Sequence, residues 1–227
     1  LALKGKKVLS IDIDPQGNTT SGFGFNKNQL EYTIYDVLIE DYDINKVIFK
    51  TEIKNLELIP ANIQLAGAEI ELTNTKFREK TLKEKINLIE NKYDFIMVDC
   101  PPSLGLLSLN ALTASNTVLI PIQCEYYSLE GVGQLIDTVK LVKKNLNPKL
   151  EIEGVILNMF DGRTNLSIQV VEEVKKYFKD KVYRTVIPRS VRLAEAPSFG
   201  QPIMLYDDKS KGSIAYIKLS EELIKNN

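Results

Sequence analysis

The chain alternates between short apolar runs and longer amphipathic segments. The short runs lie at residues 8–14, 33–39, 56–61, 95–99, 116–123, 152–160 and 183–188. Helical spacing of apolar residues is clearest over residues 65–91, 135–146, 168–178 and 213–226, and a further helix-length segment spans 104–115. The short runs lack the alternation of a half-exposed strand, so they predict an α/β fold with a mostly parallel sheet and helices on both faces.

Polar side chains stand where several of these runs end. Asp12 and Asp14 close the first run, and Asp99 closes the run at 95–99. Later runs end in Gln123 with Glu125, and in Asn158 with Asp161. In a parallel sheet the carboxyl ends of the strands share one edge, where ligands bind. Acids and amides at that edge predict a site for magnesium and phosphate, because Mg²⁺ takes one or two carboxylates, waters and phosphate oxygens.

The size and composition suit one soluble domain. The 227 residues are 44% hydrophobic, and no low-complexity tract or Pro/Gly linker divides them, so we expect a single domain over residues 1–227. There is no stretch of 18 or more apolar residues and no signal-peptide pattern near the start, which favours a cytoplasmic protein.

Histidine is absent and cysteine is rare, which narrows the possible chemistry. Without histidine the chain has no Ser-His-Asp triad, no Cys-His pair and no imidazole zinc site. Cys100 and Cys124 are not spaced as a C-x-x-C pair, so we expect two buried free thiols. Carboxylates, Lys, Arg, backbone amides and a hard cation remain available.

The formal net charge of −1 hides an uneven distribution along the chain. Residues 1–139 hold 13 basic and 19 acidic side chains, residues 140–192 hold 12 and 6, and residues 193–227 hold 4 and 5. The basic segment is compatible with a surface that binds a polyanion and equally with solvated helix faces.

Four longer motifs resemble one family in order along nearly the whole chain. They are DIDPQGN at 12–18, QCEYYSLEG at 123–131, DGRTNLSIQVVEEV at 161–174 and IPRSVRLAEAPSFGQPI at 187–203. The family is the ParA/Soj branch of the deviant Walker-A ATPases, which are relatives of MinD and have the three-layer P-loop NTPase fold. The resemblance implies an ATPase of chromosome or plasmid segregation that uses ATP and Mg²⁺. It also implies a homodimer with ATP, nonspecific binding to DNA on the nucleoid, stimulation by a ParB/Spo0J-like protein, and no membrane.

The resemblance also assigns roles to the acids. Asp14 corresponds to the residue that positions or activates the attacking water, and Asp12 to the acid nearer the magnesium shell. Asp99, at the end of FIMVD, corresponds to the Walker B acid that holds magnesium. An ordinary strand-end Asp is the alternative for Asp99 when that run is considered by itself.

Other positions match family contacts to the base and to DNA. Asn158 and Pro188 correspond to residues beside adenine, where backbone atoms often make the contact. Arg163 and Arg192 correspond to residues implicated in DNA binding. For both arginines, pairing with Glu172, Glu173 or Glu195 is the structural alternative.

The largest departure from the family is at the start. The family begins with a strand and a K-G-G-V-G-K-T-T loop, whose amides and lysines bind phosphates. None of the 227 residues form a G-x-x-x-x-G-K-[ST] run, and the chain starts with LALKGKK. We therefore expect an N-terminally truncated ATPase domain that is inactive by itself.

Two other functions remain open. A MinD-like membrane-associated ATPase is one, although SEELIKNN at the end lacks the bulky apolar and basic faces of a membrane-targeting helix. A nucleotide-independent DNA-binding or scaffold protein is the other, if the missing loop is genuine.

Overall fold

The computed structural model describes residues 1–125 and 128–227, which divide into two compact units, Leu1–Ser115 and Asn116–Asn227. The first two residues of the YYSLEG segment, at 126 and 127, lie outside the described residues. The single domain over residues 1–227 stays a prediction.

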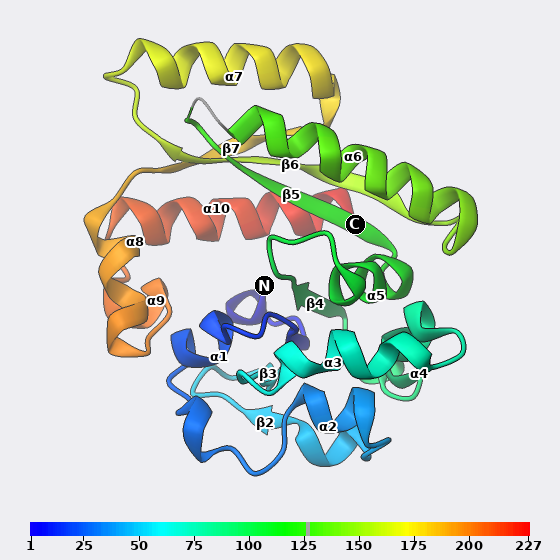
Figure 1. The fold of residues 1–227 in the computed structure, drawn as a ribbon. Helices are drawn as coiled ribbons and strands as arrows, with labels where there is room; N and C mark the ends of the chain where they lie inside the picture. The colour runs from blue at the N-terminus through cyan, green and yellow to red at the C-terminus, as the bar shows by residue number, and fades with distance from the viewer. Residues whose placement is uncertain (126–127) are drawn as a thin grey trace. The chain divides into compact units, whose positions relative to one another are not determined.

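The first unit contains short helices around a four-stranded sheet (Figure 1). Its strands are β1 (Val8–Asp12), β2 (Phe49–Lys50), β3 (Leu56–Ile59) and β4 (Phe95–Asp99). Its α-helices are α1 (Asn18–Gly22), α2 (Ile34–Ile39), α3 (Leu65–Glu71), α4 (Thr81–Ile86) and α5 (Leu106–Ala114). Short 3₁₀ turns are η1 (Ala2–Lys4), η2 (Lys27–Gln29), η3 (Ile44–Val47), η4 (Leu72–Asn74), η5 (Arg78–Lys80) and η6 (Glu90–Lys92).

The strand β1 lies inside this sheet, whose order is β2-β3-β1-β4. It pairs in parallel with β3 and β4, while β2 runs antiparallel to β3. All five residues of β1 are buried, which explains its continuous apolar run. Leu9, Ile11 and Ile13 belong to the hydrophobic core with residues of α2 to α5.

Two sequence predictions fail in this unit. The run at 33–39 reads as a strand but forms α2, because Thr33 and Asp36 make a reciprocal capping box at its start. The predicted helix over 65–91 is broken into α3, η4, η5, α4 and η6. Residues 73–75 are Thr, Asn and Thr, which are weak helix formers, and Phe77 adopts a left-handed backbone with φ 57°.

The second unit is built on a three-stranded parallel sheet, ordered β5-β6-β7. Its strands are β5 (Thr117–Gln123), β6 (Glu151–Phe160) and β7 (Val182–Pro188). Its helices are α6 (Ser128–Asn145), α7 (Asn165–Phe178), α8 (Val191–Glu195), α9 (Ile203–Tyr206) and α10 (Lys211–Asn226), with 3₁₀ turns η7 (Lys179–Lys181) and η8 (Ala196–Phe199).

Helices cover this sheet on two sides (Figure 1). Residues of α6 and α7, including Ile136, Val170 and Val174, share one core with Val155 and Leu157 of β6. The helix α10 packs along β7 on the other side, as Figure 1 shows. These are the helix–sheet–helix layers expected of a three-layer α/β protein.

The predicted fold class is confirmed: the strands are mostly parallel and helices flank both sheets. In the part of the chain that the structure describes, no helix has the length and apolar character needed to cross a membrane.

Candidate functional site

Two acids stand side by side at the carboxyl ends of β1 and β4. Asp12 and Asp99 are paired in the parallel register, and the amide of Ile13 donates to the carbonyl of Asp99 at 2.9 Å. Their exposures differ sharply, because Asp12 is fully buried whereas Asp99 is exposed. Burial raises the pKa of Asp12, while hydrogen bonds from Thr20 and Asp14 oppose that rise.

Asp14 lies just beyond β1, on a tight turn that leads into α1. Its carbonyl accepts from the amide of Gly17 at 2.8 Å, and its side-chain Oδ1 accepts from the amide of Gln16 at 2.9 Å. Asp14 is partly exposed, unlike Asp12. The turn requires Gly17, whose φ is 59° and where a Cβ would lie 2.8 Å from the carbonyl oxygen of Ala61.

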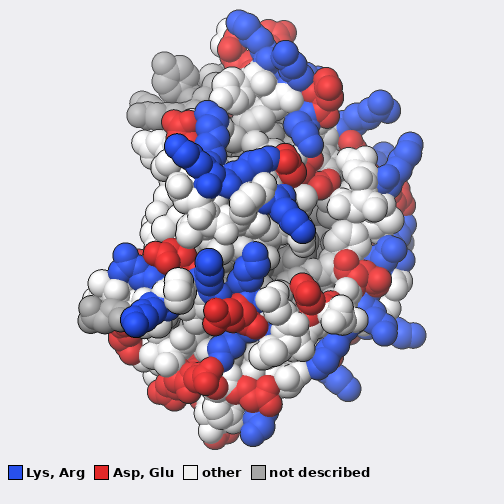
Figure 2. Space-filling model, turned by 90° about the vertical axis from the view of Figure 1, so that its right-hand side faces the viewer, with Lys and Arg blue, Asp and Glu red and all other residues white. Residues whose placement is uncertain are grey.

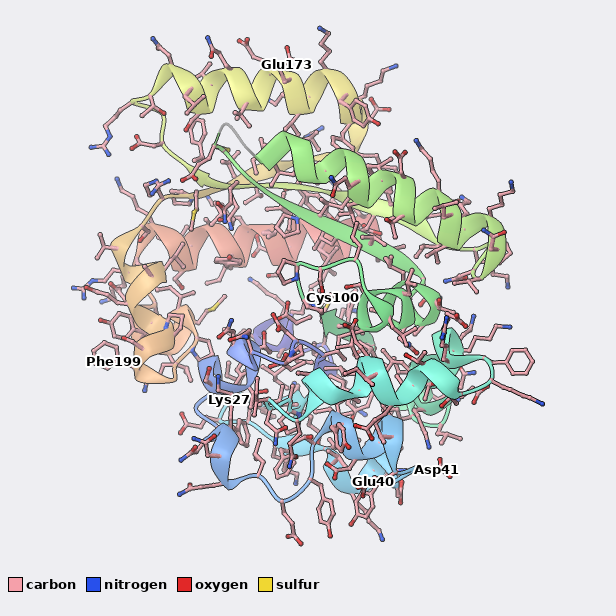
Figure 3. All side chains as sticks on the ribbon, viewed as in Figure 1. Lys27, Glu40, Asp41, Cys100, Glu173 and Phe199 are labelled. Atoms are coloured by element: carbon pink, nitrogen blue, oxygen red, sulfur yellow. The ribbon has the colours of Figure 1, made fainter. Side chains whose placement is uncertain are left out.

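The exposed carboxylate of Asp99 has a hydroxyl partner. Thr19 donates from Oγ1 to Oδ2 of Asp99 at 2.6 Å. Cys100 follows and is a free thiol with exposed surface, contrary to the expected burial, because it lies in the loop after β4; Figure 3 labels it there. Although part of the residue is exposed, protein atoms around the sulfur reduce its hydration, and together with the nearby charges of Asp99 and Asp14 this raises the pKa of Cys100 to about 12, so the thiol is protonated at neutral pH.

The donors of this region fit a magnesium ion that is shared with phosphate. Carboxylates and hydroxyls are hard oxygen ligands, and Mg²⁺ usually takes only one or two protein carboxylates. Within residues 1–125 and 128–227, no group of three or more acidic or cysteine side chains forms a closed cage for a metal. Asp99 and Asp14 are the accessible carboxylates of the three predicted acids.

Asn158 and Pro188 lie at the carboxyl ends of the adjacent strands β6 and β7. Phe160 of β6 is the register partner of Pro188, and its carbonyl accepts from the amide of Arg189 at 2.9 Å. Oδ1 of Asn158 accepts from the amide of Met159 at 2.9 Å. Both predicted residues are partly exposed, and the structure brings them to one sheet edge.

A hollow of about 850 Å³ opens at the same edge of the second unit. Its lining includes Gln123, Glu125, Asp161 and Arg189, so several of the predicted strand-end residues do gather here. Arg189 and Glu125 form an ion pair across it.

The two predicted DNA-binding arginines are both paired with acids. Arg163 makes a bidentate contact with Asp161, at 2.9 Å from Nε and 2.7 Å from Nη2. This pairing holds the pKa of Asp161 well below its usual range. Arg192, on α8, contacts Glu195 at 3.2 Å and Asp207 at 3.5 Å. Their side chains remain 89% and 57% exposed.

Basic and acidic side chains are interspersed on the face of the molecule in Figure 2, in keeping with the net charge of −1. On this face, charge alone therefore does not define a nucleic-acid surface, and the positions of individual arginines matter more.

Sequence reasoning missed the hydroxyls that hold the acids in place. Thr19 and Thr20 follow DPQGN directly, and they donate to Asp99 and Asp12. The signal was available, since buried carboxylates need donors and two hydroxyl residues lie within eight positions of Asp12. The ion pair of Arg189 and Glu125 carries no comparable signal, because its members are 64 positions apart in the sequence.

The fold and the strand-end acids are those of nucleotide-binding α/β proteins, in which ligands lie at the carboxyl ends of parallel strands. The structure is similar to cobyrinic acid a,c-diamide synthase from Mycobacterium smegmatis, solved with a bound ATP analog and magnesium. The TM-score is 0.86 and the sequence identity 35%, over 99% of this chain and 85% of that one.

The sequence comparisons are more specific. The AAA domain family matches residues 1–152. The sporulation initiation inhibitor protein Soj of Bacillus subtilis is 59% identical over 100% of this chain and 89% of its own length. The chromosome partitioning protein ParA of Myxococcus xanthus is 51% identical over 99% and 80%. The chain belongs to the ParA/Soj family of partitioning ATPases, within the AAA domain family, as the motifs indicated.

Proposed function

We propose that this chain supplies the hydrolytic carboxylates of a ParA/Soj-type ATPase that acts in chromosome or plasmid segregation. The observation that carries the proposal is the arrangement at the ends of β1 and β4. There, buried Asp12 lies in register with exposed Asp99, and Asp14 follows on a fixed turn.

In this proposal the accessible acids have different roles. Asp14 orients the water that attacks the terminal phosphate, since it is partly exposed on its turn. Asp99 holds magnesium, directly or through water, and Thr19 orients its carboxylate. Magnesium, when bound with ATP, neutralises charge on the phosphates. Asn158 and Pro188 lie beside the adenine.

Phosphate binding in ATPases of this kind depends on a further motif. A phosphate cradle consists of backbone amides and lysine at a Gly-rich loop, and no G-x-x-x-x-G-K-[ST] run occurs among the 227 residues. We infer that a polypeptide of these residues alone binds ATP poorly and hydrolyses almost none.

Calorimetry with ATP and Mg²⁺ tests this proposal. The comparison is between a polypeptide of these 227 residues and a longer protein that carries such a loop ahead of residue 1. Each charge-assisted hydrogen bond to phosphate contributes about 1.5–3 kcal/mol, so the shorter polypeptide should bind at least about 100-fold more weakly. The longer protein with its loop lysine changed to alanine is the matched control. Equal micromolar affinity in the two wild-type proteins would overturn the claim, and no binding by either would favour the nucleotide-independent scaffold.

The proposed assembly follows from the family. We infer a homodimer formed with ATP, which binds DNA without sequence preference and is stimulated by a ParB/Spo0J-like partner. Arg163 and Arg192 are exposed enough to reach phosphates, and two copies in one dimer would raise affinity through avidity. Such a protein would be cytoplasmic and associated with the nucleoid.

The MinD-like alternative has weaker support. The relatives described above, at 59% and 51% identity over nearly the whole chain, are named for sporulation control and chromosome partitioning. The diamide synthase activity named for the M. smegmatis structure is not proposed for this chain. The two chains are only 35% identical, and a shared fold does not imply a shared activity.

A further inference from the structure

The turn that carries Asp14 is held in place by hydrogen bonds to the buried carboxylate of Asp12. Asp12 is fully buried and accepts three hydrogen bonds from the residues that follow it. Its Oδ1 accepts from the amide of Asp14 at 3.1 Å, and its Oδ2 accepts from the amide and the hydroxyl of Thr20 at 2.8 and 2.7 Å. These bonds use three of the roughly four acceptor positions of a carboxylate.

The hydroxyl of Thr20 makes a second connection. While it donates to Asp12, it accepts from the amide of Ala61 at 2.9 Å, just beyond β3. Thr20 and Ala61 are themselves fully buried. One hydroxyl therefore links the end of β1, the start of α1 and the segment after β3, by donating one hydrogen bond and accepting another.

Neighbouring contacts hold the middle of the same turn. Lys27, labelled in Figure 3, donates from Nζ to the carbonyl of Gln16 at 2.5 Å. A Cβ at Gly17 would lie 2.6 Å from the Lys27 side chain and 2.8 Å from the carbonyl oxygen of Ala61, so the turn packs closely between them. The turn that carries Asp14 is therefore closely held, and this restricts the direction in which Asp14 points.

We propose that Thr20 is a positioning residue for hydrolysis, which acts through Asp12 and Ala61 to fix the turn that aims Asp14. We call the buried, hydrogen-bonded pair of Asp12 and Thr20 the clasp. In this proposal the Asp12 carboxylate stabilises the turn and does not coordinate magnesium. A valine at position 20 has the shape of threonine but can neither donate to Asp12 nor accept from Ala61, whereas serine can do both.

Amide hydrogen exchange of the 227-residue chain tests the clasp without any ligand. In Thr20→Val, exchange at Asp14, Thr20 and Ala61 should be at least tenfold faster than in the wild type, and Thr20→Ser should restore protection. Thr113→Val is the matched control, because Thr113 is also fully buried and its hydroxyl donates to the carbonyl of Leu109 at 2.7 Å within α5. That variant should leave exchange around Asp14 unchanged.

Steady-state kinetics tests the positioning role, which rests on the proposed function. In the longer protein with the phosphate loop, Thr20→Val should lower kcat at least tenfold while KM for ATP changes less than twofold, and Thr20→Ser should recover most of kcat. Unchanged exchange together with unchanged kcat in Thr20→Val would overturn the proposal. So would faster exchange with wild-type kcat, because the clasp would then not aim Asp14. A wild-type protein without hydrolysis would contradict the proposed function instead, and exchange would still decide whether the clasp exists.

Discussion

Arg163 shows how a side chain can be paired and still be available to a ligand. Its guanidinium makes a bidentate contact with Asp161, yet 89% of the side chain is exposed. A guanidinium has five N–H donors and the contact with Asp161 uses two of them, so the exposed side chain of Arg163 can also donate to a phosphate. Arg192 is more enclosed, because Glu195, Asp207 and Tyr206 all contact it.

This difference leads to a prediction for DNA binding by the ATP-bound dimer. Arg163→Ala should weaken binding to unrelated duplexes about tenfold, with a similar or smaller loss for Arg192→Ala. Two phosphate contacts per dimer are lost, so the slope of log affinity against log salt should become shallower by about 1.8. Fluorescence anisotropy at several salt concentrations measures both quantities.

Arg184→Ala is the matched control for this prediction, since it removes the same charge from an exposed position on β7. It should change affinity much less than Arg163→Ala. If neither Arg163→Ala nor Arg192→Ala alters affinity while the dimer and the ATPase remain intact, the two arginines serve only their acidic neighbours.

For single residues, the sequence predicts the positions of the acids better than it predicts which residues contact them. Asp12, Asp14 and Asp99 could be predicted at strand ends because an acid after an apolar run is visible in the pattern. The different burial of Asp12 and Asp99 could not, since it depends on Thr20 and on the position of β4 at the edge of its sheet. Pairing of Arg192 with Glu195 was foreseen as an alternative, whereas pairing of Arg163 with Asp161 was not.

At the level of helices and strands, the carboxylate of Glu222 on α10 accepts hydrogen bonds from β7. Glu222 accepts from the amides of Arg184 and Thr185 at 2.7 and 2.9 Å, and from the Thr185 hydroxyl at 2.7 Å. Partial burial tends to raise the pKa of Glu222, but these three hydrogen bonds outweigh it and lower the pKa.

Glu222→Gln should therefore destabilise the folded chain by about 1 kcal/mol at pH 7, because the amide keeps only one acceptor oxygen and its NH2 group faces a hydrogen-bond donor of β7. A carboxylate with a lowered pKa stabilises the fold above its unfolded pKa of about 4.3, and that stabilisation is lost as pH falls through the folded value. The difference between variant and wild type should shrink below about pH 4. Thermal unfolding at pH 7 and at acidic pH measures it.

Glu173→Gln, at an exposed position on α7 labelled in Figure 3, provides the control and should have little effect at either pH. A loss of stability in Glu222→Gln that is the same at both pH values would show that the carboxylate charge is not the cause.

The pattern of apolar residues predicted the elements that form continuous buried runs. It failed where helix capping or weak helix formers determine the local structure. The site residues lie at the ends of strands. These strands were predicted to within a few residues of their observed bounds. The helix α2 was misread because Thr33 and Asp36 cap a short apolar run that resembles a strand. The helix predicted over 65–91 also spans residues 72–80, where α3 has ended and only 3₁₀ turns precede α4.

Over the whole molecule, the residues assigned to hydrolysis lie in the first unit, and those assigned to adenine and DNA lie in the second. The sequence predicted the parallel α/β class, since its apolar runs and helical segments alternate. It did not predict that the strands of the described residues form one sheet of four and one of three, because the order of runs along the chain does not specify which strands pair.

The proposed function gives Asp14 and Asp99 separate roles, Asp14 in hydrolysis and Asp99 in holding magnesium. Parallel measurement of ATP turnover and Mg²⁺-dependent ATP affinity, on the longer protein and its Asp14→Ala and Asp99→Ala variants, tests it most directly. Asp14→Ala should keep its affinity within about threefold and lose at least about 100-fold in kcat, because it removes only a group that orients water. Asp99→Ala should instead lose Mg²⁺-dependent affinity. Wild-type turnover in Asp14→Ala, or an equal loss of affinity in both variants, would show that the two acids do not have these separate roles.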